Sequence, residues 1–290
     1  MASLRETKTR IGTVKTTLKI TSAMKMVAAA KLHKAQKVIE DMLPYEQNLR
    51  QILLSLLKSD TSSNSIEFFS NRPILSVALV CFSSSSSLCG AFNANVIKHV
   101  NEVISSYKSN ENIKITVYCI GRKVFEGLRK IKNIDITELS SLYESRSYSG
   151  ASELSGQLVS AFLSRKYDRV ELIYPHLKST SSQPIVHQVF LPLSKEETTD
   201  TENDLMDEEY ILEPDRKSLV DRLLPKYLNI KIFSVLLDAV AAEHAARTVA
   251  MQMASDNGDD LLHDLTLEYN KGRQQKITNE LMDIAGGNVD

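Results

Sequence analysis

Residues 1–58 carry apolar side chains at alternating spacings of three and four. This spacing places them along one side of a single helix and is typical of the seam of a coiled coil. A helix of that length would reach roughly 80 Å. We expect only Pro44 to disturb it, as a kink or local break, because proline removes a helical hydrogen bond. The apolar positions are Ile11, Val14, Leu18, Ala28, Leu32, Ala35, Ile39, Met42, Leu49, Leu53 and Leu56.

Residues 70–193 show a different pattern, in which short apolar runs alternate with helical spacing. The runs predict buried strands, and the segments between them predict helices. This alternation indicates a Rossmann-like α/β domain. The expected strands are Ile74–Phe82, Ile113–Ile120, Arg169–Tyr174 and Pro184–Leu193, and the expected helices are Asn93–Tyr107, a short one ending at Lys130, and Ala151–Leu163.

A second long helical pattern occupies residues 214–286, with heptad spacing interrupted by His244, Arg247 and Gly258. Proline is tolerated in a first helical turn, so the helix should start at Pro214 or Pro225.

Two long helices at opposite ends of a chain would pair antiparallel around a compact middle. We expect the small-residue patches Val27–Ala30 and Ala239–Ala242 to let their backbones approach closely. The predicted fold class is therefore α/β, with a long antiparallel coiled coil of N- and C-terminal helices plus a Rossmann-like α/β domain.

Charge is distributed unevenly, although the formal net charge is only -1. Residues 1–40 carry nine Lys or Arg against Glu6 and Glu40, a net of +7. Residues 194–215 carry ten acids against one lysine, a net of -9, and we expect 194–213 to form a connecting loop. A basic helix can bind nucleic acid, an anionic membrane or an acidic protein, and composition does not choose among them.

No motif for catalysis, cofactor binding or metal binding accompanies the α/β pattern. The first predicted strand ends in Ser83–Ser87 and Gly90, without the G-x-G-x-x-G or G-x-x-x-x-G-K-[ST] of nucleotide-binding loops. The histidines lack metal-ligand spacing, and no base for a nucleophile is identifiable near Cys89. We therefore assign no catalytic residue, no cofactor and no metal.

Three stretches of the chain resemble signature segments of ATP synthase gamma subunits. They are Ile20–Leu32, Leu88–Asn93 and Ala246–Leu281, and their order spans almost the whole sequence. The resemblance implies a non-catalytic part, the central rotor shaft of an F-type ATP synthase. Such a shaft transmits torque between the ion-driven membrane c-ring and a catalytic ring of three alpha and three beta subunits. The terminal helices would lie inside that ring.

The resemblance also implies contacts with the beta subunit at two places. Near the end of the chain, Arg273 and Gln274 would hydrogen-bond beta, with Thr278 and Glu280 nearby. Met24 and Lys25 would lie where the shaft passes an acidic segment of beta. An acidic protein partner then accounts for the basic first helix without nucleic acid.

In the family, the α/β domain lies at the foot of the shaft, beside the epsilon subunit and the c-ring. The chain would accordingly be peripheral to a membrane through its complex. The cytoplasmic face of a bacterial plasma membrane is the expected location, with the mitochondrial inner membrane as the alternative.

Three positions depart from the usual family pattern. Ser85–Ser87 stand where Asp-Arg-Gly is usual, so the salt link of other members is not implied here. The chain has Gly287-Asn288 where Gly-Ala is usual. Residues 194–210 contain no cysteine, so the thiol switch of chloroplast relatives is expected to be absent.

Two alternatives from other classes remain open. One is a nucleotide or phosphoester enzyme with helical oligomerisation arms, which nucleotide binding or turnover by residues 70–193 would favour. The other is a coiled-coil adaptor that binds DNA or RNA through its basic first helix, for which binding should be salt-sensitive.

Overall fold

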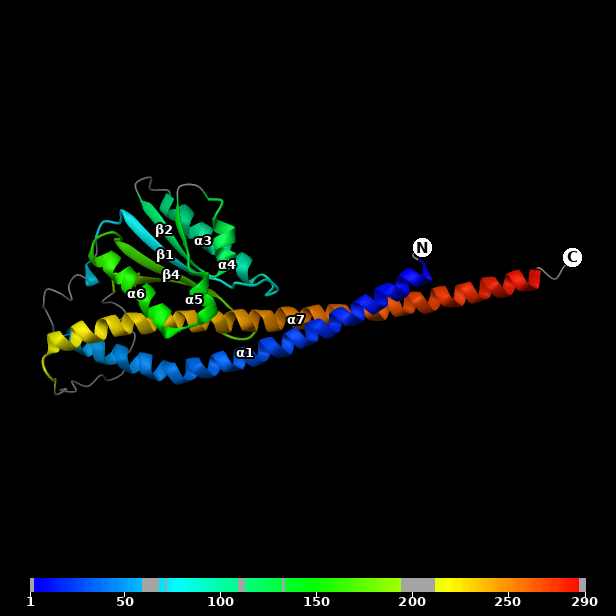
Figure 1. The fold of residues 1–290 in the computed structure, drawn as a ribbon, viewed down its shortest axis with the longest axis horizontal. Helices are drawn as coiled ribbons and strands as arrows, with labels where there is room; N and C mark the ends of the chain where they lie inside the picture. The colour runs from blue at the N-terminus through cyan, green and yellow to red at the C-terminus, as the bar shows by residue number, and fades with distance from the viewer. Residues whose placement is uncertain are drawn as a thin grey trace.

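The computed structural model describes residues 3–58, 68–70, 72–108, 113–131, 134–193 and 212–286. Two long helices run antiparallel and an α/β unit packs beside one half of them (Figure 1). Helix α1 is Leu4–Lys58 and helix α7 is Arg216–Gly286. At 1.5 Å per residue they measure roughly 80 and 105 Å. The half of the pair that projects beyond the α/β unit, α1 residues 4–30 with α7 residues 250–286, is called the shaft below.

Both prolines inside these helices are accommodated without a break. Helix α1 is continuous through Pro44, so of the expected kink or local break, the break is wrong. Pro44 is exposed, and the carbonyl that loses its helical partner can therefore meet water. Helix α7 begins just after Pro214 and continues through Pro225. Asp215 stabilises this start, because its carboxylate accepts hydrogen bonds from Ser218 N at 3.1 Å and Ser218 Oγ at 2.6 Å.

The α/β unit is built on a five-stranded sheet of order β3-β2-β1-β4-β5. The first four strands are parallel and β5 runs antiparallel to β4. Strand order reverses between β1 and β4, which makes the carboxyl ends of these two strands the topological switch point of the sheet. The strands are β1 Ser76–Phe82, β2 Lys114–Ile120, β3 Asp135–Glu138, β4 Arg169–Pro175 and β5 Ile185–Leu191.

Helices cover both faces of the sheet. Helices α3 (Phe92–Lys108) and α4 (Arg122–Leu128) enclose one aliphatic core against β1, β2 and β4. Helix α6 (Tyr148–Leu163) and the first half of α7 enclose the other core, together with the short α5 (Ser140–Ser145) and the end of α1. The α/β unit is therefore a three-layer sandwich in which a terminal helix forms part of one layer.

The elements agree with the sequence prediction apart from β3 and α5, which were not predicted. The four residues of β3 contain one aliphatic side chain and lie at the sheet edge, where pairing with β2 holds them. Helix α5 has six residues, too few to show a helical period. The predicted loop 194–213 lies almost wholly outside the described residues. None of the described helices is both long and apolar enough to cross a bilayer.

The register of the helix pair differs from the expected contact of small-residue patches. Leu32 packs in one cluster with Ala241 and Ala245, which sets residues 27–30 of α1 level with the turn after Ala246. Ala239 instead joins the core of the α/β unit and Ala242 packs on Cys89 and Phe92. The predicted contact between the two patches is wrong, because α7 turns Ala239 and Ala242 toward the α/β unit and packs Ala241 against Leu32.

Candidate functional site

Met24 and Lys25 lie on α1 within the shaft, and both are half-buried. Lys25 Nζ donates a hydrogen bond to Gln252 Oε1 of α7 at 2.7 Å. One turn away, Thr21 Oγ1 and Ser255 Oγ form a hydrogen bond of 3.0 Å between the same helices. Part of the donor capacity of Lys25 is thus used within the helix pair, and the rest of its ammonium group remains available to a partner.

Arg273, Gln274, Thr278 and Glu280 lie near the free end of α7, and all four side chains are exposed. Thr278 Oγ1 donates to the Gln274 carbonyl at 2.9 Å, an ordinary contact within a helix. Glu280 lies 3.6 Å from Lys276 Nζ in a surface ion pair. This end of α7 runs past the start of α1, whose Leu4 packs near Gly272 (Figure 1).

The two predicted contact zones are separate. Lys25 is level with Gln252, so Arg273 lies 21 residues further along α7, or roughly 30 Å. Large apolar side chains are exposed along the whole of this length, which is typical of a surface that meets a partner. They include Ile20, Met26, Val27, Met253, Leu267, Ile277, Leu281, Met282 and Ile284.

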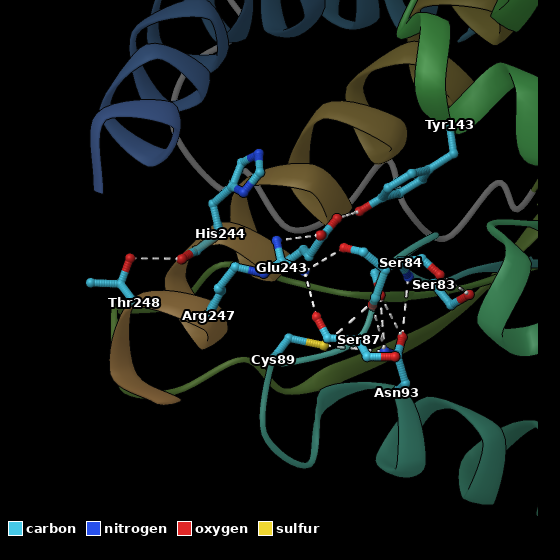
Figure 2. A network of polar contacts seen from close by, with 11 residues as sticks. Ser83, Ser84, Ser87, Cys89, Asn93, Tyr143, Glu243, His244, Arg247 and Thr248 are labelled. Atoms are coloured by element: carbon cyan, nitrogen blue, oxygen red, sulfur yellow. Dashed lines mark hydrogen bonds and ion pairs between the residues drawn. The ribbon is translucent and has the colours of Figure 1, made fainter. Parts of the chain in front are cut away.

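A polar network joins α7 to the α/β unit just before the shaft begins (Figure 2). Glu243 is only 3% exposed, and its carboxylate accepts hydrogen bonds from the Tyr143 hydroxyl of α5 and from Arg247 Nη1, the latter at 2.5 Å. Arg247 Nη2 donates in turn to Ser86 Oγ at 2.7 Å and to the Ser87 carbonyl at 3.3 Å. Burial, followed by the neighbouring Glu243 carboxylate, raises the pKa of Tyr143 well above its usual value, which keeps the hydroxyl a donor.

The serine-rich turn in this network is held by its own hydrogen bonds. Ser84 Oγ and Asn93 Nδ2 lie 2.9 Å apart, and Asn93 Nδ2 also donates to Cys89 Sγ at 3.1 Å. Ser83 Oγ accepts from Val124 N at 3.0 Å, which ties the exit of β1 to α4. Burial raises the pKa of the Cys89 thiol, so this cysteine is a structural side chain and a poor nucleophile.

A second acid anchors α7 one turn before Glu243. Asp238 Oδ2 lies 2.6 Å from His176 Nδ1, and Asp238 Oδ1 accepts from Leu177 N at 2.9 Å. Both partners follow β4 directly. Helix α7 is therefore bonded to the segment after β1 through Arg247 and to the segment after β4 through Asp238.

These contacts occupy part of the switch point of the sheet with the chain's own side chains, and a pocket of about 200 Å³ between Cys89, Pro175 and Ala246 remains beside them. In dinucleotide-binding folds of this kind, phosphate lies against the turn after β1, at the carboxyl ends of the strands. Here the Arg247 guanidinium lies against that turn, and Ala242 and Ala246 pack on Cys89 and Phe92 just beyond it. The geometry does not favour the nucleotide-enzyme alternative. Within the described ranges, no group of three or more His, Cys, Asp or Glu side chains could hold a metal ion.

His244 lies beside this network and faces α1 (Figure 2). It is 3% exposed, and neither ring nitrogen has a hydrogen-bond partner among the described residues. Burial lowers the pKa of His244 to about 4, and the cationic side chains of Arg146, Arg247 and Lys31 contribute in the same direction. The imidazole is accordingly neutral at physiological pH.

The sequence analysis did not find this network, although it singled out several of its parts. His244 and Arg247 were expected in the seam between the two helices, and Arg247 instead faces the serine-rich turn. Tyr143 belongs to a helix that was not predicted. The available signal was the coincidence of Glu243 and Arg247, an acid and a base four residues apart, on an otherwise alanine-rich stretch.

Comparison with known proteins identifies the family of the chain. The family described as ATP synthase matches residues 3–289. An ATP synthase gamma chain of Phocaeicola vulgatus is 47% identical over 289 residues, covering 100% of both chains. Another gamma chain, from Geobacter metallireducens, is 40% identical over 287 residues, covering 99% of this chain and 98% of its own. The chain belongs to the ATP synthase gamma chain family.

Solved structures show the same fold. A chain of the Euglena gracilis mitochondrial ATP synthase, in rotational state 3, superposes with a TM-score of 0.67 at 22% identity, covering 98% of this chain and 93% of its own. A chain from the Tetrahymena thermophila mitochondrial ATP synthase central stalk and c-ring gives a TM-score of 0.58 at 23% identity, covering 81% of this chain and 99% of its own. These chains therefore share the fold described above.

Proposed function

We propose that this chain is the non-catalytic central rotor shaft of a bacterial F-type ATP synthase. In this role it transmits torque between an ion-driven membrane c-ring and a catalytic ring of three alpha and three beta subunits. Membership of the gamma chain family supports the proposal. The observation that carries it is the shaft itself, a helix pair that projects from the α/β unit with its large apolar side chains exposed (Figure 1).

The exposed side chains explain why the shaft needs a surrounding partner. Burying apolar surface contributes about 25 cal/mol per Å², so a sleeve that covers this surface would be strongly favoured. The polar groups on the same surface would then set the rotational position of the shaft within the sleeve. Met24 and Lys25 lie near the base of the shaft, level with Gln252, and Arg273, Gln274, Thr278 and Glu280 lie toward its tip. We propose all six as contacts with the beta subunit.

The α/β unit lies at the opposite end from the tip, where the role requires contact with the c-ring and the epsilon subunit (Figure 1). The chain would be peripheral to the membrane, at the cytoplasmic face of a bacterial plasma membrane. The bacterial gamma chains that match it over their full length support this location.

Affinity purification of the tagged chain from its native membranes tests the assembly. Alpha, beta and epsilon subunits and the c-ring should co-purify with it in a complex that hydrolyses ATP. Recovery of the chain without alpha and beta subunits would overturn the proposal.

Replacement of Arg273 and Gln274 together by Ala tests the contact residues. Charge-assisted hydrogen bonds to beta would be lost, and coupled ATP turnover of the assembled complex should fall. Arg129→Ala with Gln157→Ala removes the same residue types from the exposed surface of the α/β unit and should leave turnover unchanged. Equal turnover in both double variants would remove the assignment of Arg273 and Gln274.

A further inference from the structure

Earlier in α7, large side chains such as Leu228 and Ile232 pack in the core of the α/β unit, but where the helix passes the turn after β1 the contact is built from small side chains. Ala239, Ala242 and Ala246 are buried where α7 crosses the sheet and the turn after β1. Alanines let a helix approach its neighbour closely, but they offer few protruding side chains to interlock with it. Apolar packing is also non-directional. Small sliding or rotation of α7 at this point would therefore be opposed mainly by other contacts.

Directional contacts are present at this point and come from two acids of α7. Asp238 holds His176 and Leu177, which follow β4, at 2.6 and 2.9 Å. Glu243 holds Tyr143 and positions Arg247, whose guanidinium reaches the turn after β1. These contacts are called the α7 joint below. Its members are Asp238, Glu243 and Arg247 of α7 with Tyr143, His176, Leu177, Ser86 and Ser87 of the α/β unit.

The spacing of the two acids makes the joint resist rotation. Five residues correspond to about 140° around a helix, so Asp238 and Glu243 leave α7 in different directions. A rotation that relaxes one set of hydrogen bonds therefore stretches the other. A translation along the helix axis stretches both.

Burial makes the bonds of Glu243 costly to break, whereas those from Arg247 to Ser86 and from Asp238 to His176 are exposed. The side chains of Glu243 and Arg247 are 5% and 12% exposed, and Tyr143 is 3% exposed. Water cannot easily replace a lost partner at such depth, so a buried acceptor without its donor bears its full desolvation cost. The joint is thus a stiff link between the shaft helix and the sheet.

We propose that the α7 joint fixes the rotational phase between the shaft and the α/β unit, with Glu243, Arg247 and Asp238 as the positioning residues. The proposal rests on the rotor function proposed above. Torque applied to the α/β unit reaches the shaft through α7, and the joint keeps α7 from yielding under that load. Loss of the joint leaves catalysis possible but loosens its coupling to ion movement.

The test uses the complete ATP synthase in inverted membrane vesicles, in which ATP hydrolysis and ATP-driven ion uptake are measured on the same preparation. For Glu243→Gln we expect hydrolysis to persist while ions moved per ATP fall roughly twofold or more, because the amide cannot replace a charged acceptor for Arg247 and Tyr143. Asp238→Asn should act in the same direction, and the two together more strongly. Arg247→Lys should also lower the number of ions moved per ATP, since lysine lacks the planar fork that spans Glu243 and Ser86.

Glu171→Gln provides a matched control within the same unit. Glu171 is a carboxylate that is 1% exposed and bonded to Tyr107, Arg169 and His187, none of which belongs to α7. This variant should lower stability but leave ions moved per ATP at the wild-type value. A fall in ions moved per ATP equal to that of Glu243→Gln would overturn the proposed role of the joint and indicate general destabilisation.

Two further outcomes are decisive. If Glu243→Gln fails to assemble, Tyr143→Phe, which removes only a hydroxyl, carries the test, and unchanged coupling in that variant would overturn the proposal. If hydrolysis and ion uptake fall in equal proportion in an assembled variant, the joint has no role in coupling. Failure of the wild-type chain to assemble with alpha and beta subunits would instead remove the rotor function itself.

Discussion

Gly258 of α7 lies directly against Leu18 of α1, so closely that a Cβ on the glycine would come within 2.6 Å of the leucine Cδ2. Both residues belong to the shaft, where the two helices have only each other to pack against. The glycine thus sets how closely the helices approach at this level. Two hydrogen bonds between the helices follow within about two turns, Thr21 to Ser255 and Lys25 to Gln252.

We expect Gly258→Ala to be less favourable than the same change at Gly12. Alanine in a helix is favoured over glycine by about 1 kcal/mol, and nothing lies within 4 Å of a Cβ at Gly12. At Gly258 the Leu18 side chain must move, which removes part or all of that gain. Thermal unfolding of the purified chain, followed by circular dichroism, measures the difference. Adding Leu18→Ala to both variants should bring them closer together, and an unchanged difference would show that the contact is not responsible.

Gly121→Ala should be severely destabilising. Gly121 follows β2 with φ 113°, and a Cβ there would lie 2.0 Å from the carbonyl oxygen of Ser83. The neighbour is backbone and cannot rotate away, so we expect a loss of at least about 3 kcal/mol or failure to fold. Gly156→Ala, at a helical position with open space around it, is the control and should stabilise slightly. Urea unfolding of both variants checks the prediction, which near-wild-type stability of Gly121→Ala would contradict.

His244 should make the protein less stable in weak acid. The folded pKa is about 4, below the usual 6.5 or so of histidine, so folding favours the neutral ring. The loss of stability is absent above a pH of about 6.5 and grows as the pH falls toward 4, by up to about 1.4 kcal/mol per pH unit. His244→Leu should flatten this part of the stability profile and, by removing unpaired polar atoms, raise stability at pH 7 by about 1 kcal/mol.

The exposed His33 of α1 provides the control for His244, because His33→Leu should leave the acid side of the profile as in the wild type. Urea midpoints measured from pH 7.5 to pH 4.5 give both profiles. If the urea midpoints of the wild type and of His244→Leu change in parallel with pH, protonation of the His244 ring is not linked to folding.

Glu171 should stabilise the α/β unit as a carboxylate. Burial raises its pKa, but the hydrogen bonds from His187 and Tyr107 outweigh burial and hold the pKa below its usual value. This stabilisation is therefore present above the ordinary glutamate pKa and is lost as pH falls through the lower folded value. Glu171→Gln should cost about 3 kcal/mol at pH 7, because Arg169 loses its buried partner.

The loss in Glu171→Gln should shrink as the pH falls, since the wild-type carboxylate is then protonated as well. Denaturant titrations at pH 7 and pH 4 measure this. Glu126→Gln provides the comparison: its half-exposed carboxylate pairs with Lys123 and Arg122, which lower its pKa, so the change should have the same direction but be much smaller. A loss that is independent of pH would indicate that the charge of Glu171 is not what stabilises the unit.

Much of the fold followed from periodicity. The heptad spacing of residues 1–58 and the apolar runs at β1, β2 and β4 predicted elements within a few residues of their observed bounds. The strands are buried on both faces, so nearly every residue in them is apolar, and the helix buries one side, so every third or fourth residue is apolar. Strand β3 and helix α5 left no such mark, because β3 depends on backbone pairing with β2 and α5 is too short.

The amino-acid sequence by itself determined two long end helices, an α/β unit between them and the family to which the chain belongs. These depend on local spacing and on motifs, which any stretch of sequence carries without reference to the rest. Only the tertiary structure decided that α7 turns Ala239, Ala242 and Ala246 toward the α/β unit and that Arg247 reaches Ser86 across 161 positions of the chain. Contacts of that kind depend on the rotation and register of one helix against a sheet, and a repeating apolar pattern leaves both free until packing sets them.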